Sequence, residues 1–172
     1  MKSIVIYSSL TGNTKQVAEA ITSVLPADTP CVSISELPSD MESYDLVFAG
    51  FWVDKGTANK EARDVLGTLH NPYIALFATA GVPPQMAHAK ESLVNAANCL
   101  PDGVEPVGTF ICQGKVDPKV IEMMYKMFPK GHSHGQSADR DARHKQAAVH
   151  PNEDDFKAAQ DFAQHILAKL DR

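Results

Sequence analysis

Short apolar runs alternate along the chain with longer segments in which apolar residues recur every three or four positions. The apolar runs predict five strands, at residues 2–8, 31–34, 45–51, 73–80 and 107–112. The runs at 45–51 and 73–80 are apolar throughout, as expected of strands buried on both faces of a sheet. The periodic segments between the runs predict helices that end near Leu25, His70 and Asn98.

Strands that alternate with helices in this way predict repeated right-handed βαβ units on a parallel sheet. Five such strands with a phosphate-binding first loop, described below, predict an α/β fold. Its doubly wound five-stranded parallel sheet would have the strand order 2-1-3-4-5. Ligands of such sheets bind where the order reverses, here at the carboxyl ends of the first and third strands.

The pattern changes between the fifth strand and the last helix. Residues 113–150 contain a predicted helix from Asp117 to Phe128, a turn and a polar segment with helical potential. The last helix is expected from about Asn152 to Leu170. We expect residues 1–172 to form a single domain that carries 113–150 as a helical insert.

Residues 8–14 connect the first strand to the first helix. They offer four hydroxyls and one amide, from Ser8, Ser9, Thr11, Thr14 and Asn13. A helix N-terminus adds unpaired N–H groups and a partial positive charge, and Gly12 lets the backbone approach a ligand closely. We interpret this segment as a phosphate-binding loop; the alternative is a capping turn without a ligand.

Several kinds of phosphate or phosphoryl site do not match this loop. The chain has no G-x-x-x-x-G-K-[ST] motif, and one glycine is too few for a dinucleotide fingerprint. The first and third strands do not end in the acidic residues of a response regulator, and the loop lacks the cysteine of a small phosphatase.

The motif Ser9-Leu10-Thr11-Gly12-Asn13-Thr14 resembles the first loop of the flavodoxin family, Ser/Thr-x-Thr-Gly-x-Thr. The resemblance implies FMN as the cofactor, with its phosphate held by hydroxyls and backbone N–H groups. Ser9, Thr11, Asn13 and Thr14 would then contribute side chains, and Leu10 and Gly12 backbone groups.

The resemblance also implies that the flavin ring lies between the loops after the third and fourth strands. The candidate residues there are Phe51, Trp52, Val53, Asp54, Lys55, Gly56, Thr57, Thr79, Ala80 and Gly81. Trp52 would stack on the ring, the alternative being ordinary packing at the sheet edge. The Lys55–Gly56 peptide would turn over to accept a hydrogen bond from reduced flavin N5, the alternative being a simple tight turn. A lysine beside the ring, Lys55, would make the flavin less strongly reducing than in other flavodoxins.

The insert is basic in an otherwise acidic protein. Residues 113–150 carry seven Lys/Arg against four Asp/Glu, whereas the whole chain has a net charge of −5. An anionic partner or substrate is therefore expected at Lys115, Lys119, Lys126, Lys130, Arg140, Arg143 and Lys145, the alternative being a solvated surface. The segment Cys112-Gln113-Gly114-Lys115 would approach the flavin pocket. Nearly the whole chain resembles a subgroup of single-domain flavodoxin-like proteins from anaerobic bacteria, some of which are associated with bilirubin reduction.

The function we expect is that of an FMN-binding electron-transfer protein, with no catalytic side chain and no metal. One alternative is an FMN-dependent reductase, or its accessory subunit, that acts on an anionic organic molecule such as a tetrapyrrole. Another is an accessory module that uses the loops only to dock a partner. The chain has three widely spaced cysteines and no secretory pattern, so we expect a cytoplasmic protein. It has no apolar run of ~18 residues, and we expect it to bind neither membrane nor nucleic acid.

Overall fold

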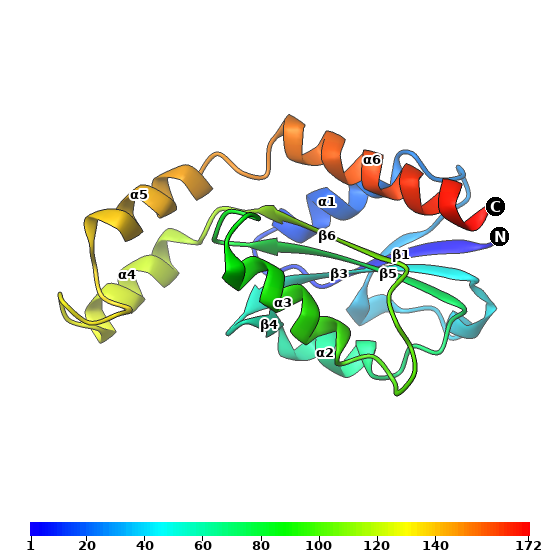
Figure 1. Cartoon of the computed structure of the whole chain (residues 1–172), viewed down its shortest axis with the longest axis horizontal. Coiled ribbons are helices and arrows are strands. Elements are labelled where there is room, and N and C mark those ends of the chain that lie inside the picture. The colour runs from blue at the N-terminus through cyan, green and yellow to red at the C-terminus, as the bar shows by residue number, and fades with distance from the viewer.

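The computed structural model describes all 172 residues, and its centre is a sheet of five parallel strands (Figure 1). The strands are β1 (Ser3–Tyr7), β2 (Cys31–Ser33), β3 (Leu46–Asp54), β5 (Tyr73–Ala80) and β6 (Gly108–Gln113). Their order across the sheet is β2-β1-β3-β5-β6. The α/β class and the predicted order 2-1-3-4-5 are therefore confirmed.

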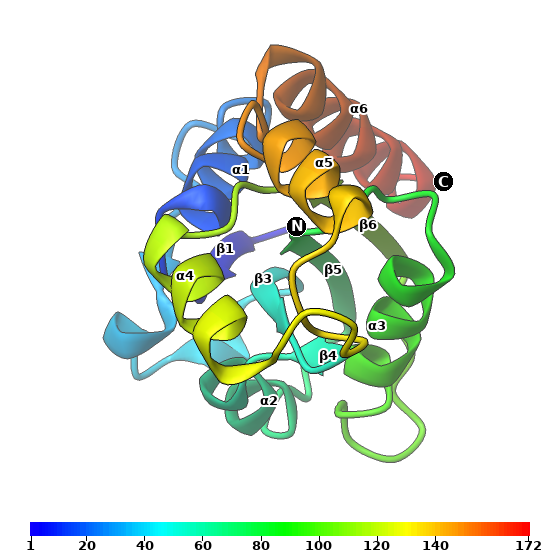
Figure 2. The same ribbon diagram turned by 90° about the vertical axis from the view of Figure 1, so that its left-hand side faces the viewer.

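Two layers of helices cover the sheet (Figure 2). Helices α1 (Asn13–Thr22) and α6 (Glu153–Leu170) cover one face, where Val17, Ile21 and Ile166 pack into the same core cluster as Phe48 and Phe77. The other face is covered by α2 (Lys60–Leu66) and α3 (Ala87–Ala97). Both faces of β3 and β5 are thus buried, which explains why their sequences are apolar throughout.

Strand β3 is longer than its apolar run and turns back on itself. It continues to Asp54 and pairs antiparallel with the short strand β4 (Thr57–Ala58). Lys55 and Gly56 form the two-residue turn with φ of 49° and 78°, the left-handed values of a type I′ hairpin. The sequence predicted an irregular loop over residues 52–58, and the structure replaces it with a hairpin.

The predicted helical insert is present as α4 (Pro118–Met127) and α5 (Ala138–Ala147). The two helices form an arm that projects from the carboxyl edge of the sheet (Figure 1). The Tyr125 hydroxyl donates to Asp141 Oδ1 at 2.9 Å and lies 3.1 Å from His144 Nδ1, so it joins α4 to α5. None of the helices has the length and apolar character needed to cross a membrane.

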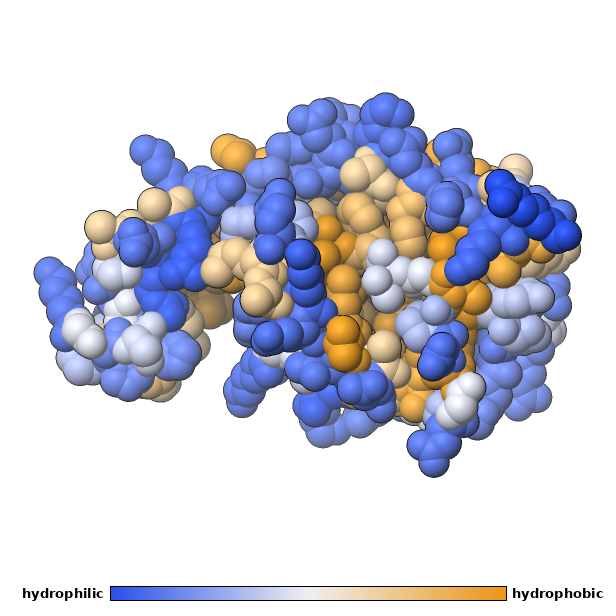
Figure 3. Space-filling view, in the orientation of Figure 1, coloured by the Kyte–Doolittle hydropathy of each residue, from blue (hydrophilic) through white to orange (hydrophobic).

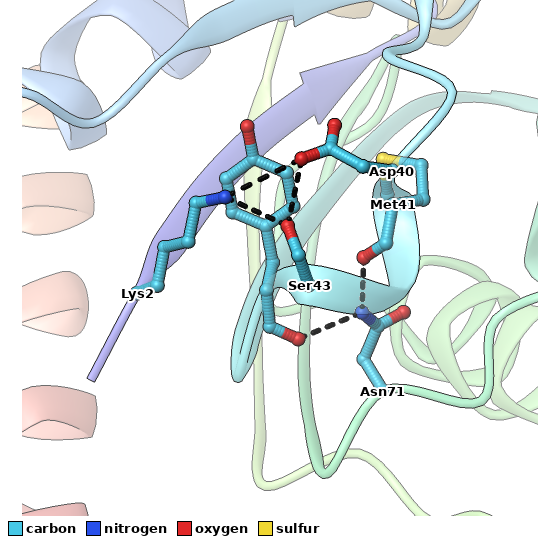
Figure 4. Close-up of polar contacts among 6 residues, drawn as sticks. Lys2, Asp40, Met41, Ser43 and Asn71 are labelled. Carbon is cyan, nitrogen blue, oxygen red and sulfur yellow. Dashed lines mark hydrogen bonds and ion pairs between the residues drawn. The ribbon is translucent and has the colours of Figure 1, made fainter.

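At the amino edge of the sheet, a buried amide ties the 3₁₀ turn η2 (Met41–Ser43) to the start of β5 (Figure 4). Asn71 Nδ2 donates to the carbonyl oxygens of Met41 at 2.8 Å and Tyr44 at 2.9 Å. Beside it, Lys2 Nζ donates to Ser43 Oγ at 2.7 Å and lies 4.2 Å from the centre of the Tyr44 ring. The segment between β2 and β3 is therefore held by specific polar contacts.

We predict that Asn71→Ala lowers the free energy of unfolding by about 1–3 kcal/mol, because the Tyr44 carbonyl loses its side-chain donor in a buried position. Urea unfolding monitored by circular dichroism measures the change. The control is Gln164→Ala on the exposed side of α6, which should change stability by less than about 0.5 kcal/mol. Equal effects of the two substitutions would contradict this role of Asn71.

Candidate functional site

A pocket of about 240 Å³ lies at the carboxyl edge of the sheet, next to the ends of the neighbouring strands β1 and β3. Three of its walls come from the loop after β1, the end of β3 and the end of β5. The predicted residues in its lining are Ser9, Leu10, Thr11, Asn13, Thr14, Trp52, Val53, Asp54, Thr79, Ala80 and Gly81. The site predicted from the order of the strands is thus brought together as one cavity.

The loop after β1 presents a set of hydrogen-bond donors. Ser9 Oγ accepts from the N–H groups of Gly12 at 3.1 Å and Lys15 at 3.3 Å, which closes the turn. Gly12 has φ of 93°, a left-handed value that side chains rarely adopt. The backbone N–H groups of the remaining loop residues, Leu10, Thr11, Asn13 and Thr14, donate to no acceptor in the chain. Such free donors at a helix N-terminus fit a phosphate.

A buried hydroxyl pair joins this loop to the middle of the sheet. Thr14 Oγ1 and Thr79 Oγ1 lie 2.9 Å apart, and the two residues are 1% and 3% exposed. One hydroxyl donates in this bond, and the other keeps its proton for a second acceptor. The first turn of α1 is therefore fixed relative to the end of β5.

The other end of the pocket is apolar and aromatic. Trp52 is half-buried and lines the cavity together with Val53, and Val116 and Val120 contribute from the start of the insert. An aromatic face with aliphatic neighbours suits a flat ring system, because stacking and the exclusion of water both stabilise it. The pocket therefore combines a phosphate-binding end with a ring-binding end.

The root of the insert forms the fourth wall. Asn13 Nδ2 donates to the Lys115 carbonyl at 2.9 Å, across 102 residues of sequence. A Cβ atom on Gly114 would lie 2.7 Å from Asn13 Nδ2, and one on Gly81 would lie 2.7 Å from Val116 Cγ2. These glycines let the backbone of the root pack directly on two cofactor loops. The predicted approach of residues 112–115 to the pocket is confirmed for Gly114 and Lys115, which line it, whereas Cys112 and Gln113 are buried outside the lining.

Five lining residues were not among the predicted cofactor-binding residues, and three of them, Val116, Asp117 and Val120, also lie outside the segment that was expected to approach the pocket. Asp117 caps α4 by accepting from Lys119 N at 2.8 Å, and Pro118 occupies the first turn. Val116 lies just before this cap and Val120 lies in the first turn of α4, and both line the pocket. The Asp-Pro pair that starts the helix is the signal by which the sequence indicates them.

Other predicted residues lie outside the lining. Ser8 is buried and its Oγ accepts from Asn59 Nδ2 at 2.8 Å, so it joins the loop after β1 to the start of α2. Gly12 contributes through the turn that it closes. Phe51 is fully buried in the core beneath α2 and α3, which does not support its predicted contact with a ring.

The hairpin residues Lys55, Gly56 and Thr57 are also absent from the lining. The Gly56 carbonyl accepts from Asn95 Nδ2 at 2.8 Å, so the turn is held against α3. The structure shows a tight turn at these residues, and the turnover of the Lys55–Gly56 peptide on flavin reduction stays a prediction. Lys55 is not the cation of the pocket either, since Lys115 lines it, together with Asp54 and Asp117.

The cysteine nearest to the pocket is not reactive. Burial raises the pKa of Cys112 to about 12, and the charge of Asp155 adds to the effect. The thiol therefore stays protonated at neutral pH and is no nucleophile. What the pocket offers is hydrogen-bond donors, an aromatic wall and three charged side chains.

Comparison with known proteins agrees with this geometry. A family described as "Flavodoxin domain" matches residues 4–164. The chain is 36% identical over 176 residues to the flavodoxin-like domain-containing protein BilS of Clostridioides difficile (strain CD3), with 98% of each chain covered.

Two solved structures have the same fold. The flavodoxin of Streptococcus pneumoniae TIGR4 superposes with a TM-score of 0.58 at 14% identity, over 98% of this chain and 99% of that one. A flavoprotein from Lactobacillus acidophilus NCFM in complex with FMN gives a TM-score of 0.52 at 19% identity, over 64% and 93% of the two chains. With the family match over residues 4–164 and a relative at 36% identity along nearly its whole length, the chain belongs to the flavodoxin-domain family.

Proposed function

We propose that this protein binds FMN at the carboxyl edge of its sheet and transfers electrons between redox partners. FMN is the cofactor that the pocket fits. The observation that carries the proposal is the loop of residues 9–14, which has free backbone N–H groups and lines a cavity together with Trp52. When bound, the flavin supplies the redox chemistry, and the protein sets its orientation and exposure.

The phosphate end of the site holds an anion without a cationic side chain. Residues 8–14 contain no Lys or Arg, so the charge of the phosphate would be balanced by N–H groups, hydroxyls and the start of α1. Thr11 is exposed and lines the pocket, so its hydroxyl is free to donate. Asn13 positions the loop, because its amide is already bound to the Lys115 carbonyl.

The ring end supports exchange of electrons with a partner. Leu10 is 66% exposed and Val120 is 36% exposed, and both border the pocket. Met123 and Met127 continue the apolar face of α4 outward, at 57% and 65% exposed. Exposed apolar side chains around a cofactor pocket favour transient docking of another molecule.

A second candidate is a reductase, or its accessory subunit, that acts on an anionic organic molecule such as the tetrapyrrole bilirubin. The supporting observation is that Lys115 lines the pocket and six further basic residues follow in the arm. This surface would attract carboxylates in either role. Bleaching of the bound flavin by NAD(P)H alone would favour the reductase, whereas dependence on an added reductase protein favours electron transfer.

We predict that Thr11→Val weakens FMN binding roughly tenfold, because one hydrogen bond to a charged phosphate is lost. Riboflavin, which lacks the phosphate, should bind both proteins equally. Quenching of flavin fluorescence measures both affinities. The matched control is Thr68→Val near the end of α2, which should leave FMN binding unchanged. An unaltered affinity of Thr11→Val for FMN would argue against the phosphate role of the loop.

We further predict opposite shifts of the flavin midpoint potential from the two charges at the root of the insert. Lys115→Gln should lower it and Asp117→Asn should raise it, each by on the order of 20–60 mV, because a cation stabilises the reduced anionic ring and an anion destabilises it. Spectroelectrochemical titration measures the shifts. Lys119→Gln, at the second residue of α4 and outside the pocket lining, is the control. Shifts of the same sign from both substitutions would contradict this arrangement.

A further inference from the structure

The two edges of the sheet are protected unequally. The β2 edge has only three residues and follows directly after Pro30, so it offers little to a second chain. The β6 edge has six residues, Gly108-Thr109-Phe110-Ile111-Cys112-Gln113, without a charge or a proline, and it pairs only with β5. Cys112 and Gln113 are buried, so the accessible part of this edge is residues 108–111. An edge of this kind presents free N–H and C=O groups and is a template for pairing with another strand.

A groove of about 530 Å³ lies between α3 and the amino end of this edge. Its lining combines four apolar residues, Leu93, Val94, Ala97 and Val104, with polar ones that include Lys90, Glu105 and Thr109. Val94 is 61% exposed, although it lies in the middle of the helix. Figure 3 shows apolar residues gathered along the middle of this face, between the polar outer surfaces of α6 and α3.

We propose that the β6 edge and its groove form a homodimer interface, in which β6 pairs antiparallel with β6 of a second copy. Two identical edges pair in this way about a two-fold axis perpendicular to the sheet. That axis keeps each helical layer on its own side, so α3 of one copy lies beside α3 of the other. Val94 then becomes buried against the second copy.

The charges of the groove are arranged for this pairing. Helix α3 runs antiparallel to β6, so Lys90 lies at the carboxyl end of the groove and Glu105 at its amino end. Neither takes part in an ion pair within its own chain. A two-fold axis through the middle of β6 brings Glu105 of each copy to Lys90 of the other. This complementarity favours a second copy over an unrelated extended peptide.

The dimer leaves both cofactor pockets accessible. Antiparallel pairing puts the two carboxyl edges at opposite ends of a continuous sheet. The arms, which project from those edges, therefore point away from each other (Figure 1). The inference depends on β6, α3 and the segment that joins them, which lie outside the cofactor pocket, so it is independent of FMN binding.

Sedimentation velocity of the full chain at 1–200 µM tests the proposal. We expect a monomer–dimer equilibrium in which Lys90→Glu and Glu105→Lys each raise the dimer Kd roughly tenfold, because two symmetry-related contacts change from attraction to repulsion. The double variant Lys90→Glu/Glu105→Lys should return within about threefold of the wild type, since the opposite charges face each other again. Glu36→Lys, next to the β2 edge, is the matched control and should leave the Kd unchanged.

Circular dichroism of each variant confirms that it is folded. A wild-type protein that is monomeric over the whole concentration range would overturn the proposal, and no variant is needed for that result. A dimer whose Kd responds to neither single substitution, or whose double variant is not rescued, would equally rule out this interface.

Discussion

Parallel pairing of β1, β3 and β5 is the constraint on which the rest of the site depends. The register places Tyr7 beside Gly50, Gly50 beside Phe77 and Trp52 beside Thr79. All three strands therefore end at one edge, which brings the loops that follow them together there. The approach of β3 to its neighbour needs Gly50, because a Cβ atom there would lie 2.2 Å from the Phe77 ring. The buried pair Thr14–Thr79 then fixes α1 to this frame.

The arm extends this frame and gives the pocket its distinctive wall. Its root is tied to the phosphate loop through Asn13 and packed on the loop after β5 through Val116. The return of the chain is tied as well, since the Lys115 N–H donates to the His150 carbonyl at 2.8 Å. His150 in turn bonds Asp155 at 2.6 Å, in the capping box of α6. The root of the arm is therefore fixed beside the pocket, so a molecule bound at this root would lie close to the bound cofactor.

Strong local patterns in the sequence predicted most of this structure. The apolar runs gave the five strands of the sheet, and the hydroxyl-rich motif of residues 9–14 marked the loop that lines the pocket. Phe51 and Trp52 were both assigned to the ring, although successive residues of a strand face opposite sides. That alternation sends Phe51 into the core and leaves Trp52 at the pocket.

The remaining features depend on tertiary contacts that no local pattern encodes. The turn at Lys55–Gly56 reads equally well as a loop or a hairpin, and only pairing of Val53 with Ala58 decides between them. The contact of Asn13 with Lys115 joins residues that are distant in sequence. The basic composition of the insert therefore could not show which of its lysines and arginines lies at the pocket. The difference between the two sheet edges likewise becomes visible only when the order of the strands is known.

The central claim is that residues 9–14 and Trp52 form one site for a flavin that carries a phosphate. Fluorescence titration of the purified protein with FMN and with riboflavin tests this claim most directly. If the loop holds the phosphate and Trp52 contacts the ring, one FMN binds per chain, its binding quenches the emission of Trp52, and riboflavin binds with clearly lower affinity. Equal affinity for the two flavins, or FMN binding that leaves the emission of this single tryptophan unchanged, would contradict it.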